Sequence, residues 1–134
     1  MTIFIDSNVF VAYYNTRDEQ HEKATKLIEK IMTFEYGLPV TSDYVFDETI
    51  TATFVRTKNK PIAIKLGNQI ASSIKMLKIN TTVFQDAWKI FKTTKNTLSF
   101  TDCTNIAFLS IINDNKIATF DKEFENIEGI KVIT

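Results

Sequence analysis

Short apolar runs rich in β-branched residues alternate along this chain with longer segments of helical periodicity. The runs fall at residues 2–5, 38–40, 116–120 and 130–133. The first run stops at Asp6, a pattern typical of a strand that is buried on both faces. Because helices separate the strands, we expect parallel pairing through right-handed crossovers. The sequence therefore predicts an α/β fold of three layers (α/β/α) with a short, mostly parallel central sheet.

Between these runs, apolar residues recur at spacings of three and four, which is the period of amphipathic helices. We expect helices over 18–34, from Thr41 or Ser42 through Phe54, and over 61–77, 82–94 and 101–114, with a short helical stretch after Asp6. Residues 101–114 are apolar nearly all round, which predicts burial against several neighbours. At 134 residues, the chain is expected to form a single domain, 1–134.

Charge and cysteine content exclude several classes of protein. Sixteen basic residues balance sixteen acidic ones, so the chain lacks the positive excess of many nucleic-acid binders, and charge must be judged locally. Cys103 is the only cysteine and His21 the only histidine, which argues against a disulfide, a common zinc site or a Cys–His catalytic pair. Neither a signal peptide nor a membrane span is recognisable, so we expect a cytoplasmic protein that does not enter the membrane.

Four of the acidic residues differ from the rest in their surroundings. Asp6 follows the first apolar run, Glu48 lies among apolar helix residues, Asp102 opens the most apolar helix, and Asp121 follows the third run. In parallel α/β sheets, ligands bind beyond the carboxyl ends of the strands, where Asp6 and Asp121 fall. Each acid also has a structural explanation. The aspartates could cap helices or begin turns, and Glu48 could be a half-exposed helix residue with Asp47 competing for its role.

Convergence of these carboxylates at one rim of the sheet would require compensation. Two like charges about 4 Å apart repel by roughly 4 kcal/mol at an effective dielectric constant of about 20. Such a cluster therefore needs bound cations or raised pKa values. An all-oxygen site without histidine or cysteine suits Mg²⁺ or Mn²⁺, whose coordination is often completed by phosphate oxygens of a substrate. The chemistry indicated is phosphoryl transfer.

Four short motifs carry these acids: FIDSNVF at the start, VFDETI around Glu48, SFTDCTNIAFL around Asp102 and ATFDKEF around Asp121. Together they resemble the motifs of PIN-domain ribonucleases, especially the VapC-type toxins of bacterial type II toxin–antitoxin pairs. The resemblance covers essentially the whole chain. It implies a PIN-like fold and a metal-dependent endoribonuclease that hydrolyses RNA phosphodiesters with Mg²⁺ or Mn²⁺.

The same resemblance implies a catalytic quartet with one acid from each motif: Asp6, Glu48, Asp102 and Asp121. The three aspartates of this quartet, Asp6, Asp102 and Asp121, would be the metal ligands. Asn8 matches the Asp-x-Asn of the opening motif, and Thr119 matches a hydroxyl residue two positions before the last acid. Both are expected to position the acids.

Positive charge is needed where RNA approaches a rim of carboxylates. One group lies at the end of the Glu48 helix, at Arg56, Lys58 and Lys60. A second forms a helical stripe, at Lys89, Lys92 and Lys95. Either group could contact RNA phosphates or be a solvated helix face, and we assign RNA binding to the first.

The resemblance also implies partners. A cognate antitoxin would bind near the first helical stretch, where Phe10, Tyr13 and Tyr14 could form either core or a partner surface. Homodimers are common among the resembling toxins, so a homodimer is expected.

Three other functions fit parts of the pattern. A haloacid-dehalogenase-like phosphatase would have a second aspartate two residues after the first, where this chain has Asn8. A receiver domain would have paired acids after its first strand and a lysine after its last strand, and neither is found. A catalytically silent PIN-like module that binds RNA or protein is the third alternative, and the presence of all four acids argues against it.

Overall fold

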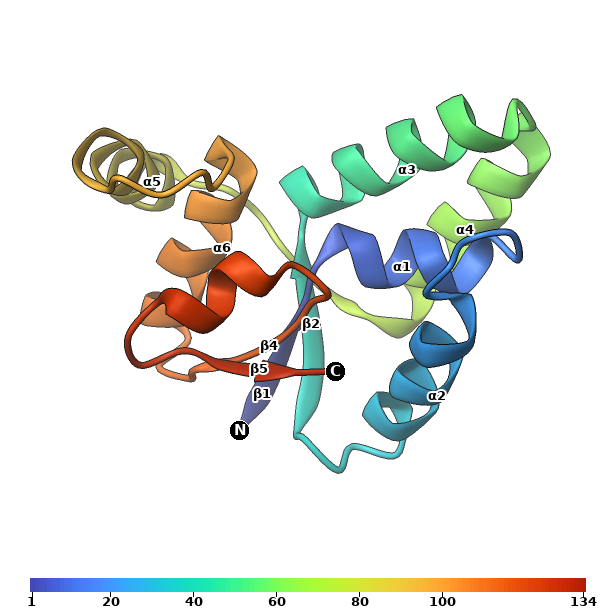
Figure 1. Ribbon diagram of the computed structural model, residues 1–134, viewed down its shortest axis with the longest axis horizontal. Coiled ribbons are helices and arrows are strands. Elements are labelled where there is room, and N and C mark those ends of the chain that lie inside the picture. The colour runs from blue at the N-terminus through green and yellow to red at the C-terminus, as the bar shows by residue number, and fades with distance from the viewer.

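In the computed structural model of residues 1–134, a parallel sheet lies between two layers of helices (Figure 1). Its strands are β1 (Thr2–Ile5), β2 (Leu38–Ser42), β3 (Lys75–Leu77), β4 (Lys116–Ala118) and β5 (Lys131–Ile133). The five strands have the order β3-β2-β1-β4-β5, and every neighbouring pair is parallel. The predicted three-layer α/β fold is confirmed.

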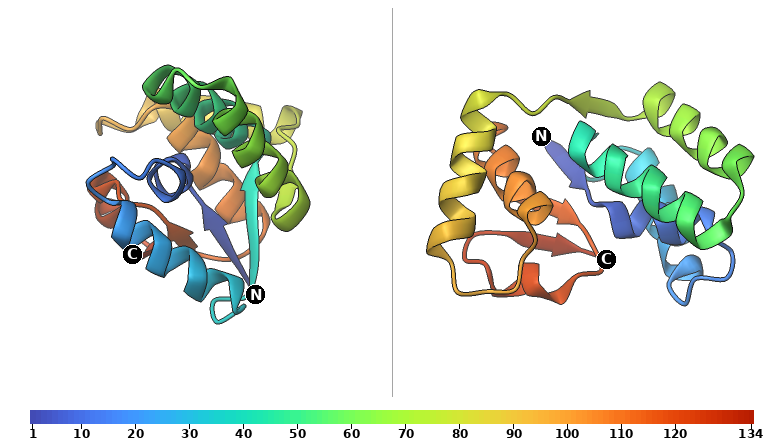
Figure 2. Two further views of the ribbon diagram at one scale, coloured as in Figure 1. Left: turned by 90° about the vertical axis from the view of Figure 1, so that its right-hand side faces the viewer. Right: turned by 90° about the horizontal axis from the view of Figure 1, so that it is seen from above.

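The crossover helices divide between the two faces of the sheet. The chain connects β1 to β2 through α1 (Ser7–Tyr14) and α2 (His21–Met32), and β2 to β3 through α3 (Asp43–Thr57) and α4 (Lys60–Ser73). It then reverses direction across the sheet, through α5 (Thr81–Thr93) and α6 (Phe100–Ile111) to β4, and through the 3₁₀ turn η1 (Lys122–Asn126) to β5. Right-handed crossovers place α5 and α6 on the face opposite α1–α4, as Figures 1 and 2 show. None of the helices has the length and apolar surface that a membrane crossing requires.

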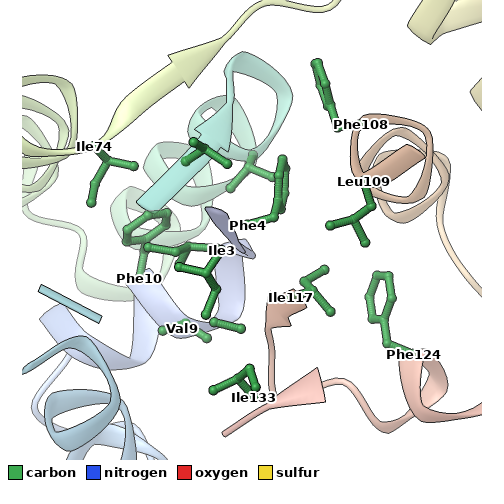
Figure 3. Packing of buried hydrophobic residues seen from close by; sticks show 14 of the residues in the cluster. Ile3, Phe4, Val9, Phe10, Ile74, Phe108, Leu109, Ile117, Phe124 and Ile133 are labelled. Carbon is green, nitrogen blue, oxygen red and sulfur yellow. The ribbon is translucent and has the colours of Figure 1, made fainter. Parts of the chain in front are cut away.

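β1 lies at the centre of the sheet and is buried from both sides. Alternate side chains point to opposite faces, so Ile3 packs toward α1 and Phe4 toward α6 (Figure 3). The Phe4 ring stacks on Phe108 with centroids 6.0 Å apart. Truncating a buried phenylalanine such as Phe4 to alanine costs about 3–5 kcal/mol. This packing holds the carboxyl end of β1, and hence Asp6, in a fixed place between the two layers.

The expected helix over 61–77 is wrong at its end. α4 ends at Ser73, Ile74 takes extended backbone angles (φ −118°, ψ 133°), and residues 75–77 form the edge strand β3. Ile74 continues the spacing of four from Ile70, and like Ile70 it is buried in the core. A three-residue strand is also too short to show an alternating pattern of its own, which is why the sequence did not reveal it.

Gly67 allows α4 to approach the helix that carries Glu48. A Cβ added at this glycine would lie 3.1 Å from Ile50 Cδ1 and 3.2 Å from Phe46 Cζ, both on α3. Glycine costs about 1 kcal/mol relative to alanine inside a helix. The close packing of α3 on α4 gives the physical reason for accepting this cost here.

Candidate active site

The carboxyl ends of β1 and β4 open into a cavity of about 460 Å³. α1, α3 and the start of α6 supply its other walls. All four acids singled out in the sequence line it: Asp6, Glu48, Asp102 and Asp121. β1 and β4 are neighbours on either side of the point where the chain reverses its direction across the sheet, which is where parallel α/β sheets form ligand sites. The topology therefore brings together acids that are far apart in sequence.

Asp6 is the deepest of the four and is only 2% exposed. It caps the N-terminus of α1, where its Oδ1 accepts a hydrogen bond from the Ser7 N–H at 2.8 Å. The same oxygen accepts from Asn105 Nδ2 at 3.2 Å, and Oδ2 accepts from Thr119 Oγ1 at 2.8 Å. Groups from α1, α6 and the end of β4 thus fix its orientation.

Burial raises the pKa of Asp6 to about 7. The neighbouring charges of Asp102 and Glu48 contribute to this rise and the hydrogen bonds from Thr119 and Ser7 reduce it, so that about 7 is the net pKa. Desolvation is the largest cause, because a charged carboxylate loses its hydration in this position. The site therefore favours a proton or another cation on Asp6.

Asn8 and Thr119 link the two strand ends. Asn8 Nδ2 donates to Thr119 Oγ1 at 3.0 Å, and Asn8 Oδ1 accepts from the Phe120 N–H at 3.0 Å. Thr119 Oγ1 also accepts from the Asp121 N–H at 3.1 Å. The Phe120 and Asp121 N–H groups thus donate to side chains and not to a neighbouring strand. β4 accordingly ends at Ala118 and not at residue 120 as expected. The same contacts hold the loop that carries Asp121.

Asp102 belongs to a capping box at the start of α6. The Asp102 N–H donates to Ser99 Oγ at 3.1 Å, and Asp102 Oδ2 accepts from the Ser99 N–H at 3.0 Å. Burial raises the pKa of Asp102, and the charges of Asp121 and Glu48 add to the rise, while its hydrogen bonds with Ser99 lower it. The helix-start explanation for this residue is thus correct, and it also lines the cavity.

Glu48 and Asp121 lie at the more accessible part of the cavity. Glu48 is exposed on α3, and the Ser7 hydroxyl donates to its Oε1. Asp121 Oδ1 accepts from the Glu123 N–H at 2.9 Å, which caps η1. Asp47, the competing acid, lines a neighbouring cavity and not this one.

Little positive charge of the chain itself reaches these acids. Arg56 lines the cavity, but its Nη1 pairs with Asp18 Oδ2 at 3.6 Å. Lys58 and Lys60 are exposed, lie near the far end of α3 and do not line the cavity. None of the four site acids forms an ion pair with a lysine or arginine. Their negative charge is left for a ligand to balance.

The donors of the cavity fit a hard divalent cation in chemistry and in charge. They are carboxylate oxygens without any histidine or thiolate, the set that Mg²⁺ and Mn²⁺ prefer. No three acidic, histidine or cysteine side chains are drawn together closely enough to hold one ion by themselves. Mg²⁺ commonly uses only one or two carboxylates and completes its coordination with water and substrate phosphate. The open cavity leaves room for both.

Sequence reasoning missed two side chains that contact these acids, Ser7 and Asn105. Asn105 is fully buried, and its Oδ1 has no hydrogen-bond partner. An amide within an otherwise apolar helix was the signal that could have found it. By contrast, Cys103 is buried in the core, and His21 Nδ1 lies 2.8 Å from the Ala12 carbonyl oxygen. Neither of these two lines the cavity.

Known proteins share this sequence pattern and this fold. Ribonuclease VapC6 of Methanocaldococcus jannaschii is 27% identical over 146 residues, which cover 98% of this chain and 95% of the relative. The crystal structure of Mycobacterium tuberculosis VapC20, described as a sarcin-ricin loop cleaving toxin, superposes with a TM-score of 0.83 at 21% identity and covers 92% of this chain and 93% of that one.

Two further structures share the fold. VapBC-1 of nontypeable Haemophilus influenzae gives a TM-score of 0.72 at 18% identity, covering 99% of this chain and 97% of that one. VapBC2 of Rickettsia felis, bound to a DNA fragment from its promoter, gives 0.71 at 13% identity, covering 99% and 98%. Residues 3–130 match the PIN domain, a span that includes all four cavity acids. Together with the sheet order and the acidic cavity, this match shows that the chain belongs to the PIN-domain family.

Proposed function

We propose that this protein is an endoribonuclease that hydrolyses RNA phosphodiesters with Mg²⁺ or Mn²⁺ and acts as the toxin of a toxin–antitoxin pair. The observation that carries the proposal is the meeting of Asp6, Glu48, Asp102 and Asp121 in one cavity without a compensating cation from the chain. The names of the relatives, a ribonuclease and a sarcin-ricin loop cleaving toxin, support RNA as the substrate.

Each residue of the site would have its own part in hydrolysis. Asp6, Asp102 and Asp121 would hold the metal together with water or substrate phosphate oxygens, because the acids do not lie close enough to hold one ion by themselves. A bound divalent ion supplies positive charge that activates water and stabilises the phosphoryl oxygens. Asp6 would release its proton as the ion binds, because its pKa of about 7 leaves it partly protonated near neutral pH. Glu48, exposed and held by the Ser7 hydroxyl, would accept a proton from the attacking water.

Cleavage of a structured RNA tests this function. The wild-type protein should cleave it with Mg²⁺ or Mn²⁺ and not in the presence of a chelator. Asp6→Asn and Asp102→Asn should each lower cleavage by about 10²-fold or more, whereas Glu29→Gln, at an exposed acid on α2, should leave it unchanged. Circular dichroism would verify that the variants are folded. Undiminished cleavage by both aspartate variants, or by the wild type in chelator, would refute the assignment.

We also propose an apolar groove between α1, α2 and α4 as the binding site of the antitoxin. Its volume is about 240 Å³, and its walls are mainly aromatic and aliphatic side chains: Phe10, Tyr13, Tyr14, Ile28, Met32, Leu66, Ile70 and Ile74. Such a groove suits the apolar face of an amphipathic helix. The VapBC names of two structures with this fold support an antitoxin as the partner, and a homodimer is proposed from the family likeness.

Co-purification with the product of an adjacent small reading frame tests this surface. Met32, which is 37% exposed, can be changed to glutamate without burying a charge in the core. Met32→Glu should weaken antitoxin capture and leave RNA cleavage intact. Capture at wild-type strength would exclude the groove. Light scattering of the free protein measures whether it is a dimer.

A further inference from the structure

A polar cavity of about 510 Å³ lies next to the acidic cavity and has no part in the roles assigned above. Its walls come from the end of α1 and the loop that follows it, from the C-terminal end of α3 and from the start of α4. Figures 1 and 2 show that loop beside the C-terminal end of α3. We call it the arginine cavity, because two arginines and no acid line it. The lining residues are Tyr14, Asn15, Thr16, Arg17, Arg56, Thr57 and Ile62.

The two arginines of this cavity are available to an anion. Arg17 is exposed, and its side chain forms no ion pair or hydrogen bond within the chain. Arg56 pairs with Asp18 at 3.6 Å, but its side chain is 57% exposed, and ion pairs as exposed as this are weak. Asp18 lines the acidic cavity and not this one, and Glu19 lines neither. An anion in the arginine cavity would therefore have two cations and no carboxylate around it.

Other polar groups of the cavity can also donate hydrogen bonds. Asn15 Oδ1 accepts from the Arg17 N–H at 3.1 Å, which leaves Asn15 Nδ2 free to donate. Thr16 is exposed, and its hydroxyl has no partner within the chain. The Thr57 hydroxyl is already used, since it donates to a carbonyl of its own helix at 2.7 Å. Guanidinium, amide and hydroxyl donors are the groups that bind phosphate oxygens, and one arginine can bind two of them at once. The chemistry of the cavity thus fits a phosphate.

Arg56 connects the two cavities, because it lines both. Their charges are opposite. The acidic cavity needs a bound cation before a phosphate can enter it, whereas the arginine cavity supplies its own positive charge. An RNA strand carries one phosphate for each nucleotide. A strand with one phosphate at the acids can therefore place a flanking phosphate in the arginine cavity.

We propose that the arginine cavity is a phosphate subsite, where Arg17 and Arg56 bind a backbone phosphate that flanks the cleaved phosphodiester. The inference rests on the proposed ribonuclease function and adds Arg17 and a second point of contact to it. Contacts to phosphate fix the register and orientation of a nucleic acid without reading its sequence. Arg17 thus contributes to binding and alignment of the RNA and does not touch the reacting atoms.

Binding of RNA without cleavage tests the subsite first. We would measure the fluorescence anisotropy of a labelled oligouridylate in chelator. Arg17→Ala should weaken binding by about 3- to 10-fold, because a charge-assisted contact in an exposed position is lost. Arg17→Lys should weaken it less, since it keeps the charge but loses the forked pair of donors. Lys23→Ala is the matched control and should bind like the wild type, because Lys23 is an exposed cation of α2 that does not line these cavities.

Cleavage with Mg²⁺ then identifies the phosphate that Arg17 contacts. Each phosphate on either side of the cleaved bond would be replaced in turn by an uncharged methylphosphonate. With the wild type, one of these replacements should slow single-turnover cleavage by about 3- to 10-fold at protein concentrations below saturation. With Arg17→Ala the same replacement should have no further effect, because its partner is already lost, and the other replacements should act as they do on the wild type.

The outcomes separate this inference from the proposed function. Additive effects of Arg17→Ala and every methylphosphonate would overturn the subsite and leave the ribonuclease standing. Weaker binding with Arg17→Ala but not with Lys23→Ala, in a protein that shows no metal-dependent cleavage, would support the subsite and refute hydrolysis. Equal weakening by the two substitutions would overturn the subsite, because it would show a response to net charge alone.

Two further results would give the cavity another occupant and overturn the proposal. Displacement of the oligouridylate by an equal concentration of uridine 5′-monophosphate would show that the cavity holds a terminal phosphate and not the backbone. Unchanged binding of RNA by Arg17→Ala, together with a loss of antitoxin capture, would assign the cavity to the antitoxin. This second result is worth testing because Tyr14 lines both the arginine cavity and the apolar groove.

Discussion

Two aspartates at opposite ends of the same pair of strands have opposite surroundings. Asp114 precedes β4 near its amino end, where its Oδ2 accepts from the Thr2 N–H at 2.8 Å and its Oδ1 accepts from Lys116 Nζ at 2.8 Å. Asp6 follows β1 at its carboxyl end and has acids, not a lysine, as its charged neighbours. Desolvation raises the pKa of both. At Asp114 the hydrogen bonds from Lys116, Thr2 and Asn115, together with the charge of Lys116, outweigh desolvation, so the net pKa lies below the usual range. At Asp6 the net pKa is raised to about 7.

The difference separates an acid whose charge the chain itself balances from one whose charge the chain leaves unbalanced. Asp114 ties the amino ends of β1 and β4 together, and its charge is balanced by the chain itself. Asp6 is held as firmly by hydrogen bonds, yet its charge is not balanced by a cationic side chain. An acid that is well oriented and electrostatically uncompensated is suited to binding a cation.

Exchanging the carboxylate for an amide at each place is expected to give the largest effects. Asp6→Asn should lower the rate of RNA cleavage by about 10²–10³-fold, because a charged group that serves the transition state is lost. Asp114→Asn should leave the cleavage rate near that of the wild type and lower the free energy of unfolding by about 1.5–3 kcal/mol. Single-turnover kinetics and urea unfolding measure the two quantities. A loss of cleavage with Asp114→Asn in folded protein would break the distinction.

The pH dependence of stability should also separate the two ends. Because the folded-state pKa of Asp6 is raised, the folded protein keeps a proton there that the unfolded chain has lost, so stability of the metal-free protein falls as the pH rises from about 4 to about 7. The upper bound of this loss is about 4 kcal/mol, because a difference of one between the pKa values of the folded and unfolded chain corresponds to about 1.4 kcal/mol. The lowered pKa of Asp114 has the opposite sign and removes stability only in acid, below about pH 4.

Urea unfolding at pH 5, 6, 7 and 8 in chelator checks this window. Asp6→Asn should flatten the decline, and Asp114→Asn should not change it. Adding Mg²⁺ to the wild type should raise the melting temperature more at pH 8 than at pH 5, because the ion competes with a proton for Asp6. Equal shifts at the two pH values would contradict metal binding at this residue.

Most of the fold could be predicted from the sequence because its buried elements follow strict periods. The strand at 2–5 and the helices around Leu27 and Ala87 carry apolar residues at the spacings that burial requires. β3 could not be predicted, because the helical spacing continues to Ile74, one residue before the strand begins. Its pairing with β2 is decided by tertiary contacts that the local pattern does not contain.

The acids of the candidate site could be predicted, but not the polar side chains that hold them. Asp6 and Asp121 follow apolar strands, so the topology alone sends them to one edge of the sheet. Asn105 is 99 residues from Asp6 in sequence, and its contact depends on how α6 is rotated against β1. The pattern of neighbouring residues in the sequence does not determine that rotation of α6.

Thr119→Val tests whether orientation, as well as charge, matters at Asp6. The substitution keeps the shape of the side chain and removes the hydroxyl that donates to Asp6 Oδ2. We expect a 10- to 100-fold loss of cleavage, the usual effect of removing a partner that orients a metal ligand. Thr41→Val is the matched control, because Thr41 is equally buried but donates to the Ile5 carbonyl oxygen. Equal losses of activity would mean that the hydroxyl of Thr119 acts only through stability.

The smallest effect should come from the cations near the acids. Asp114 has its own lysine, whereas Arg56, the arginine that lines the acidic cavity, pairs with Asp18. If Arg56 contacts an RNA phosphate, Arg56→Ala should reduce the slope of log affinity against log salt by about one. Lys58→Ala and Lys60→Ala should change it less, because neither side chain lines the cavity.

Binding of an uncleavable RNA in chelator, measured from 50 to 300 mM salt, gives these slopes, with exposed Lys65 of α4 changed to alanine as the control. An unchanged slope for Arg56→Ala would remove this residue from the RNA path. A larger change for the two lysines would place that path along the C-terminal end of α3. If none of the three substitutions changed the slope, no cation at this end of α3 would guide RNA to the acids, and the metal alone would balance their charge.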